Sequence, residues 1–294
     1  MPLLSMLVLV LAAASASAQS SITPLLWKVT SPQGAVYLYG TVHVGAPDFY
    51  PLPKEVESAF NNSRVVALEA DPSNQANLTS ALAKAGYSAG QSIEQFIAPD
   101  LVDDLKRTLP ALGVPFDSAR RMKPYLLSMV MTVIELGRMG YDAQMGVDMH
   151  LAQRAKREGK ALIELESMAA QLALFDALAP DQQESMLRTT LQSMRTKELQ
   201  TNLTQLIAAW RAGDEIRLME LVEHDMRDFA PSFRDEFKWV FYDKRNQEMA
   251  KRIVAFLNDA QGPHFVAVGA GHLPGDTGIV ALLRKQGYEI TRVR

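Results

Sequence analysis

The stretch YLYGTVH, residues 37–43, indicates the kind of fold that the chain adopts. It is an apolar run rich in aromatic and β-branched residues, with the turn sequence SPQG (31–34) before it and GAP (45–47) after it. Such a run between turns is typical of a buried β-strand. We therefore expect His43 just beyond a strand end, at the edge where open α/β sheets bind their ligands.

The same pattern recurs near the other end of the chain, where HFVAV (264–268) leads into GAGH (269–272). In both places a glycine follows an apolar run and a histidine stands three residues after the glycine. Glycine at a strand end lets the backbone turn tightly or lie close to a ligand. If the two strands are neighbours, His43 and His272 converge on one site.

A carboxylate follows the next predicted strand, because RVVALE (64–69) is a continuous apolar run that ends in Glu69. A helix is expected between the two strands, over residues 53–60, since a proline suits its first turn. Strand, helix and strand indicate a parallel pair joined by a right-handed crossover. Glu69 would then lie at the same sheet edge as His43, although a solvated loop carboxylate remains the alternative.

The remaining pattern predicts an α/β fold of the mixed α+β kind. A central, mostly parallel sheet is built from both chain ends. Strands are expected at 25–29, 35–39, 161–166, 265–268 and 288–293, and large helical insertions at about 74–159 and 167–260. Residues 1–18 have an uncharged apolar run and end in ASA, as in a secretory signal peptide cleaved near Ala18. Residues 19–294 are predicted to form a single domain.

Composition limits the function classes. The chain has no cysteine, so a metal ion here would be held by histidine, aspartate, glutamate or water. A net charge of −3 without a basic cluster argues against nucleic-acid binding. No segment after the signal is long and apolar enough to span a membrane. Export without disulfides favours a periplasmic or secreted protein.

His43, Glu69 and His272 together form a ligand set suited to a divalent metal that activates water, with Asp148 or Glu166 moving protons. A metal-free scheme uses the same residues. One histidine is then the general base, oriented by Glu69, and the other stabilises the developing oxyanion. Both schemes stay open at this point.

Seven motifs together resemble the TraB/GumN family, which includes the TIKI proteases and is related in fold to the erythromycin esterase and ChaN-like proteins. The motifs are YLYGTVH, VVALEAD, MKPY, GVDMHL, ELES, KRN and FVAVGAGHLPGDTGIVALLRKQGYEI. The resemblance implies a mixed α/β core, and metal-dependent peptidase activity as in the TIKI branch. It also implies that His43, Glu69 and His272 are the active residues, with Mn, Co or Zn as the metal.

By position in these motifs, four further residues become candidates to orient the substrate or support the site: Asp148, Glu166, Arg245 and Asn246. A structural salt-bridge network is the alternative. We expect an exported hydrolase, a metal-dependent peptidase acting on peptide or protein amide bonds. The alternatives are a metal-free histidine hydrolase and a non-catalytic periplasmic protein that binds peptides or is connected with polysaccharides. His150 is expected to be structural, and His224 to be an exposed, ion-paired side chain.

Overall fold

The computed structural model describes residues 22–227, 229–259 and 262–294. The predicted signal peptide, residues 1–18, lies outside these described residues. Six strands form one sheet in the order β4-β3-β5-β2-β1-β6. Their bounds are β1 Leu26–Thr30, β2 Ala35–Thr41, β3 Val65–Leu68, β4 Ala161–Glu164, β5 His264–Gly269 and β6 Glu289–Val293.

Strand directions confirm the mostly parallel sheet built from both chain ends. β4, β3, β5 and β2 pair in parallel, whereas β1 pairs antiparallel with β2 and with β6. The predicted pairing of the strands on either side of residues 53–60 is wrong in one respect. β2 and β3 run in parallel, but β5 lies between them and pairs with both. A strand from the far end of the chain thus fills the centre of the sheet.

Helices occupy the long segments between strands, as the sequence predicts. One helix, α1 (Lys54–Asn62), connects β2 to β3, and α13 (Ile279–Lys285) connects β5 to β6. The segment between β3 and β4 contains α2 Gln75–Lys84, α3 Pro99–Thr108, α4 Phe116–Ala119, α5 Pro124–Arg138 and α6 Val147–Arg157. The segment between β4 and β5 contains α7 Met168–Asp176, α8 Pro180–Arg195, α9 Glu198–Ala212, α10 Glu215–Asp225, α11 Pro231–Lys238, the π-helical turn η5 Trp239–Asp243, and α12 Lys244–Leu257.

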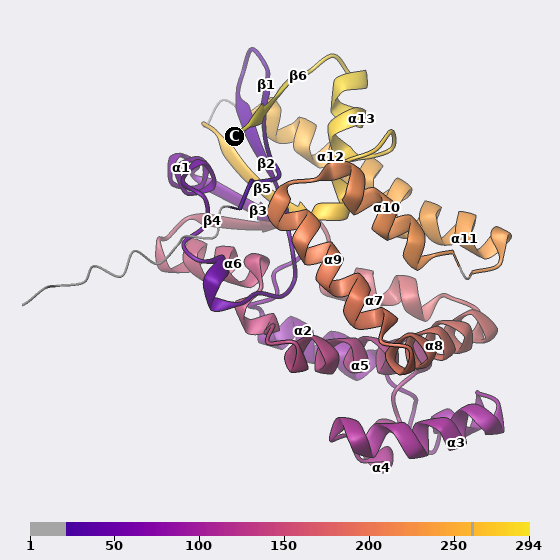
Figure 1. Ribbon diagram of the computed structural model, residues 1–294. Coiled ribbons are helices and arrows are strands. Elements are labelled where there is room, and N and C mark those ends of the chain that lie inside the picture. The colour runs from indigo at the N-terminus through magenta and orange to yellow at the C-terminus, as the bar shows by residue number, and fades with distance from the viewer. Residues whose placement is uncertain (1–21, 228, 260–261) are drawn as a thin grey trace, which may run out of the picture.

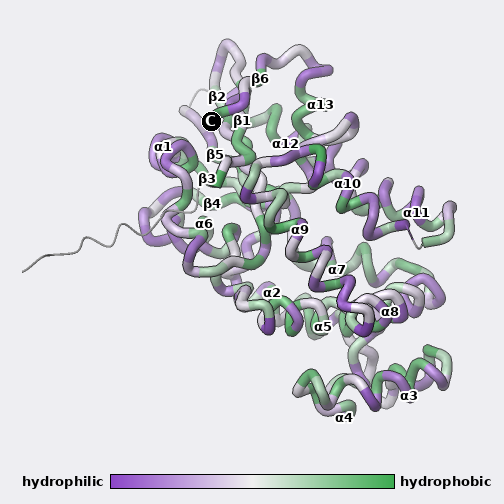
Figure 2. Tube along the Cα trace, viewed as in Figure 1, coloured by the Kyte–Doolittle hydropathy of each residue, from purple (hydrophilic) through white to green (hydrophobic). Residues whose placement is uncertain are grey.

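The sheet is covered on both faces, with α1 and α6 on one side and α12 and α13 on the other (Figure 1). The central strand β5 is accordingly buried along nearly its whole length, and Figure 2 shows that the central strands are largely hydrophobic. The helices α2, α5 and α8 lie away from the sheet, and α3 and α4 lie farthest from it (Figure 1). Within the described residues, no helix is both long and apolar enough to cross a membrane.

Two interactions bring the loop after β2 and the start of α6 together. The amide of Val147 donates to the carbonyl of Val42 at 3.0 Å, and Gly45 pairs with Asp142 through two 2.9 Å backbone hydrogen bonds. Gly146 lies so close to the carbonyl of His43 that a Cβ atom there would be 2.5 Å from its oxygen. The first turn of α6 is therefore fixed against the segment that contains His43.

Candidate active site

The carboxyl ends of four parallel strands meet at one edge of the sheet, and the predicted site residues follow them. β2 and β5 are neighbours in a register that places Thr41 beside Gly269, so His43 and His272 emerge from adjacent strands. Glu69 continues the pairing of β3, since its amide donates to the carbonyl of Ala267 at 3.1 Å. The convergence expected from the two strand, glycine and histidine motifs is therefore present.

Gly269 lies at the centre of this arrangement. A Cβ atom at this position would be 3.3 Å from Oε2 of Glu69, and 3.6 Å from both Nε2 of His43 and Cδ2 of His272. The three side chains thus meet within 3.6 Å of one point. Gly40, its counterpart in the first motif, has another role, because a Cβ atom there would be 3.1 Å from Cβ of Leu25 in the core.

His43 is held by a carboxylate from α6. Its Nδ1 lies 2.7 Å from Oδ2 of Asp148, and the hydroxyl of Thr41 donates to the other oxygen of the same carboxylate. Asp148 is buried, whereas 71% of the His43 side chain is exposed. Because a carboxylate accepts hydrogen bonds, Nδ1 of His43 carries a proton and Nε2 faces the site.

Glu69 accepts hydrogen bonds at both of its oxygens. Oε2 accepts from the amide of Gly269 at 2.8 Å. Oε1 accepts from the guanidinium of Arg245 and, at 2.8 Å, from Nε2 of Gln171. Nε2 of His272 lies 3.8 Å from the same oxygen. The carboxylate is thereby oriented from three sides while it faces both imidazoles.

Arg245 joins two carboxylates that follow neighbouring strands. Its Nε and Nη2 donate to Glu166 at 3.0 and 2.8 Å, and Nη2 also reaches Glu69. The amide of Glu166 donates to the carbonyl of Glu69 at 2.8 Å, so the two acidic residues are extensions of the paired strands β3 and β4. Such a fork of donors fixes carboxylate geometry more firmly than a lysine could.

His272 is buried and is oriented by an amide from α12. Its Nδ1 lies 2.7 Å from Oδ1 of Asn246, whose Nδ2 donates to the carbonyl of Thr277 at 3.0 Å. This pairing identifies the oxygen of the amide, so Nδ1 of His272 is the donor. The ring centroids of Tyr242 and His272 are 5.5 Å apart. Nε2 is left to face Glu69.

The pKa values of the two imidazoles are shifted in opposite directions. The Asp148 carboxylate raises the pKa of His43 to about 9, so this imidazole is protonated at neutral pH. Burial, together with the nearby Arg245 guanidinium, lowers the pKa of His272, which is therefore neutral. Burial alone would raise the pKa of Glu69, but His272, His43, Arg245 and the Gly269 amide together lower it to about 2. An acid, a base and a fixed anion thus share one space.

The predicted metal ligands fit a metal ion only in part. Each imidazole has Nδ1 engaged and Nε2 directed into the site, as metal-binding histidines usually do. Glu69 does not fit as it stands, because the positive guanidinium of Arg245 already occupies Oε1. Over residues 22–227, 229–259 and 262–294, no group of three or more histidine, cysteine, aspartate or glutamate side chains is arranged to hold a metal ion.

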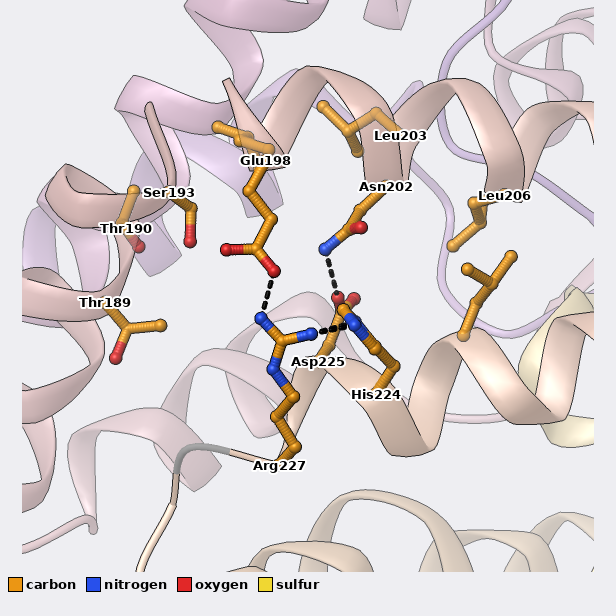
Figure 3. A pocket seen from close by; sticks show the side chains of 12 residues that line it. Thr189, Thr190, Ser193, Glu198, Asn202, Leu203, Leu206, His224, Asp225 and Arg227 are labelled. Carbon is orange, nitrogen blue, oxygen red and sulfur yellow. Dashed lines mark hydrogen bonds and ion pairs between the residues drawn. The ribbon is translucent and has the colours of Figure 1, made fainter. Parts of the chain in front are cut away.

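A cavity of about 60 Å³ opens beside His43, Glu69 and Asp148. A larger pocket of about 140 Å³ lies between α8, α9 and α10 and contains no predicted site residue (Figure 3). His224 lines that larger pocket beside Arg227, and it is partly buried rather than exposed as the sequence predicted. His150 stacks on Tyr50 with ring centroids 4.3 Å apart, a packing role that agrees with its structural interpretation.

Sequence reasoning missed three residues of the site: Thr41, Gln171 and Tyr242. Thr41 reads as an ordinary β-branched strand residue. Gln171 stands in an otherwise apolar helical stretch, and a polar residue there is the one available signal. Tyr242 belongs to the π-helical turn η5, a feature that no hydrophobic period reveals.

Comparison with known proteins relates the chain to a family. Metalloprotease TIKI1 of Danio rerio is 25% identical in an alignment that covers 92% of this chain and 63% of the relative. Human metalloprotease TIKI1 is 23% identical over 92% of this chain and 62% of the relative. The chain thus spans less than two thirds of these relatives. The uncharacterized protein YbaP of Escherichia coli K12 is 26% identical over 84% of this chain and 87% of its own length. No solved structure matches the chain. The TraB/PrgY/gumN family profile matches residues 25–292, and the chain therefore belongs to the TraB/PrgY/gumN family.

Proposed function

We propose that the chain is an exported hydrolase that cleaves peptide or protein amide bonds. One observation carries the proposal: a buried carboxylate and two imidazoles with opposite proton affinities surround the space above Gly269. The name metalloprotease, given to the TIKI relatives, supports amide hydrolysis as the reaction. Peptide or protein is accordingly the substrate class that we assign.

In this proposal His272 is the general base. Its neutral Nε2 takes a proton from a water molecule, whose oxygen attacks the amide carbon. Glu69, 3.8 Å from Nε2, stabilises the imidazolium that forms, and Asn246 keeps the ring in the required tautomer. Burial of His272 favours this role because it keeps the imidazole neutral before the reaction.

His43 is the complementary acid. As an imidazolium it donates through Nε2 to the developing oxyanion, and it passes a proton to the departing amine nitrogen when the C–N bond breaks. Asp148 holds the ring and its charge in place. One water and one amide thus become a carboxylic acid and an amine, and the proton taken by His272 restores His43 through solvent.

Metal dependence by Mn, Co or Zn stays a prediction. His43 and His272 would contribute Nε2, and Glu69 would have to release Arg245 before it could bind an ion. Treatment with a chelator, followed by addition of Mn²⁺, Co²⁺ or Zn²⁺, distinguishes the two schemes. Loss and recovery of cleavage would support the metal scheme, and cleavage unaffected by chelation would support the metal-free one.

The test of the function uses the purified chain and a fluorogenic peptide library. His43→Ala and Glu69→Gln should each reduce cleavage by about 100-fold or more, the usual contribution of acid or base catalysis. His224→Ala changes a partly buried histidine that lines the pocket between α8, α9 and α10, and it should leave cleavage unchanged. Thermal melting shows that the variants fold. Full activity of His43→Ala, or peptide binding without cleavage by the wild type, would overturn the proposal.

Export is part of the proposal. The sequence of residues 1–18 supports it, and intact mass measurement of protein recovered from the periplasm or medium tests it. The mass of a chain that begins near residue 19 would agree with cleavage at Ala18. The mass of a chain that still contains residues 1–18 would contradict it.

A further inference from the structure

The cavity beside the catalytic residues has two chemically different walls. His43, Glu69 and Asp148 form the polar wall. The apolar wall is made by side chains from four separate segments, namely Ala70, Pro72, Ala143, Met149 and Met168. An apolar surface that faces reacting groups is suited to hold part of a substrate rather than to move protons.

The apolar wall is built on well-packed structure. Ala70 follows the strand extension that contains Glu69 and is buried. Met149 is buried in the first turn of α6, next to Asp148. Met168 begins α7 and is only partly buried, and it packs against a hydrophobic cluster that includes Tyr125. The position of the wall relative to His43 is therefore set by the same elements that set the polar groups.

One polar side chain, Gln171, interrupts this wall, and its donor is already engaged. Nε2 of Gln171 donates to Glu69 at 2.8 Å and to Glu166 at 3.2 Å. The carboxylates of Glu69 and Asp148 are likewise paired with Arg245 and His43. A charged group placed against the apolar residues would lose water without gaining a partner from them, which is unfavourable.

We infer that this cavity is the specificity subsite for a short aliphatic side chain, of the alanine or valine class, on a substrate residue next to the scissile bond. The inference rests on the proposed amide hydrolysis and adds to it the identity of the preferred residue. The volume of about 60 Å³ agrees, because ~15 Å³ is the least that holds one water molecule. A group of a few carbon atoms fills this volume, whereas a phenylalanine ring would extend beyond it.

Met168 sets the size limit of the subsite. It is the less buried of the two methionines, so shortening it enlarges the cavity with little effect on the core. Methionine is flexible and lets a cavity adapt to aliphatic groups of slightly different shape. Met168→Ala should therefore move the preference from valine toward leucine and phenylalanine, and Ala143→Leu should restrict it to glycine and alanine.

The experiment measures kcat/KM for a peptide series that varies one position on each side of the cleaved bond. The wild type should cleave the alanine and valine peptides about tenfold or more faster than those with glycine, phenylalanine, aspartate or lysine at one of the two positions. Met168→Ala should reverse the ratio of valine to phenylalanine. Met139→Ala removes a partly buried methionine at the end of α5 and should leave the ratio as in the wild type.

The outcomes separate the subsite from the function. Cleavage by the wild type without an aliphatic preference, or a ratio unchanged by both Met168→Ala and Ala143→Leu, overturns the subsite and leaves the hydrolase in place. Equal shifts from Met168→Ala and Met139→Ala also overturn it, because the effect would not be local. Absence of any cleavage overturns the proposed function and the subsite with it.

Discussion

The amide of Gly269 donates a 2.8 Å hydrogen bond to Oε2 of Glu69, across a sequence separation of 200 residues. This bond turns the carboxylate toward the end of β5 and leaves open space above the glycine. His43 and His272 border that space from the other sides. The glycine of the second motif is therefore needed for the room that it leaves between three reactive side chains.

Gly269→Ala should remove activity without unfolding the chain. The backbone at Gly269 has φ −50° and ψ 134°, which alanine adopts without strain. Its methyl group would lie 3.3 Å from Glu69 and 3.6 Å from both imidazoles, where a substrate carbonyl has to sit. We expect kcat/KM to fall about 100-fold, as for a displacement of roughly 1 Å in a reacting group. Peptide cleavage and thermal melting measure the two effects.

Gly271→Ala is the matched control for this change. A Cβ atom at Gly271 would make ordinary contacts, 3.5 Å from Cε1 of Tyr242 and 3.6 Å from Cγ2 of Val222. It would not enter the space between Glu69 and the two imidazoles, so most activity should remain. An active Gly269→Ala variant, or equal losses in the two variants, would show that the space above Gly269 is not where the substrate binds.

Strand ends could be predicted from the sequence because they depend on local patterns. His43, Glu69 and His272 each follow a short apolar run, and the carboxyl ends of parallel strands meet at one edge. The order of the strands could not be predicted in the same way. A buried parallel strand has the same continuous apolar sequence whether or not it is central in the sheet. The local sequence therefore does not show that β5 lies between β2 and β3. That insertion is what brings His272 beside Glu69.

The residues that support the site were harder to find. Arg245 and Asn246 came from the family resemblance alone, since each reads as an ordinary helix residue. Asp148 and Glu166 were also named as carboxylates that could move protons, but nothing in the sequence indicated their partners. Their roles depend on contacts such as the 2.7 Å approach of Asn246 to His272, between segments that no pattern connects. Between β4 and β5, residues 167–213 were also predicted as one helical stretch and not as the separate helices α7, α8 and α9, because amphipathic periods continue across short turns.

Asp148→Asn should shift the pH range of activity. The Asp148 carboxylate raises the pKa of His43 to about 9, so removal of the charge should lower that pKa toward 6.5. A catalytic acid works only while it is protonated, and activity is therefore lost as the pH rises through its pKa. The alkaline limb of kcat/KM should move down by about 1 to 3 pH units. The acidic limb, which reports His272, should stay in place.

Thr41→Val tests whether the shift comes from charge. It removes the hydroxyl that donates to Asp148 and retains the carboxylate beside His43. Its alkaline limb should therefore remain close to that of the wild type, even if the rate falls. Equal pH profiles for Asp148→Asn and the wild type would mean that His43 is not the acid whose proton is transferred.

Arg245→Met should destabilise the chain, because the carboxylates of Glu69 and Glu166 would then repel each other. Only 14% of the Arg245 side chain is exposed, and its guanidinium bridges Glu69 and Glu166. Removal of one partner from a buried ion pair costs about 3 to 5 kcal/mol, because the remaining charge loses its partner. Chemical denaturation at neutral pH measures this loss. Addition of Glu166→Gln to the variant should recover part of it, since one of the two negative charges is gone.

The pH dependence of this loss identifies its origin. In the wild type the pKa of Glu69 is lowered from 4.5 to about 2, so the carboxylate stabilises the fold above pH 4.5 and loses that contribution as the pH falls toward 2. Without Arg245 the pKa is lowered less, and the stability difference between wild type and variant should shrink over the same interval. Lys251→Met breaks an exposed pair with Glu248 on the same helix and should have little effect at any pH. If Arg245→Met is no more destabilising than Lys251→Met, the guanidinium is not what holds the two carboxylates together, and Glu69 must be oriented by Gly269 and Gln171 alone.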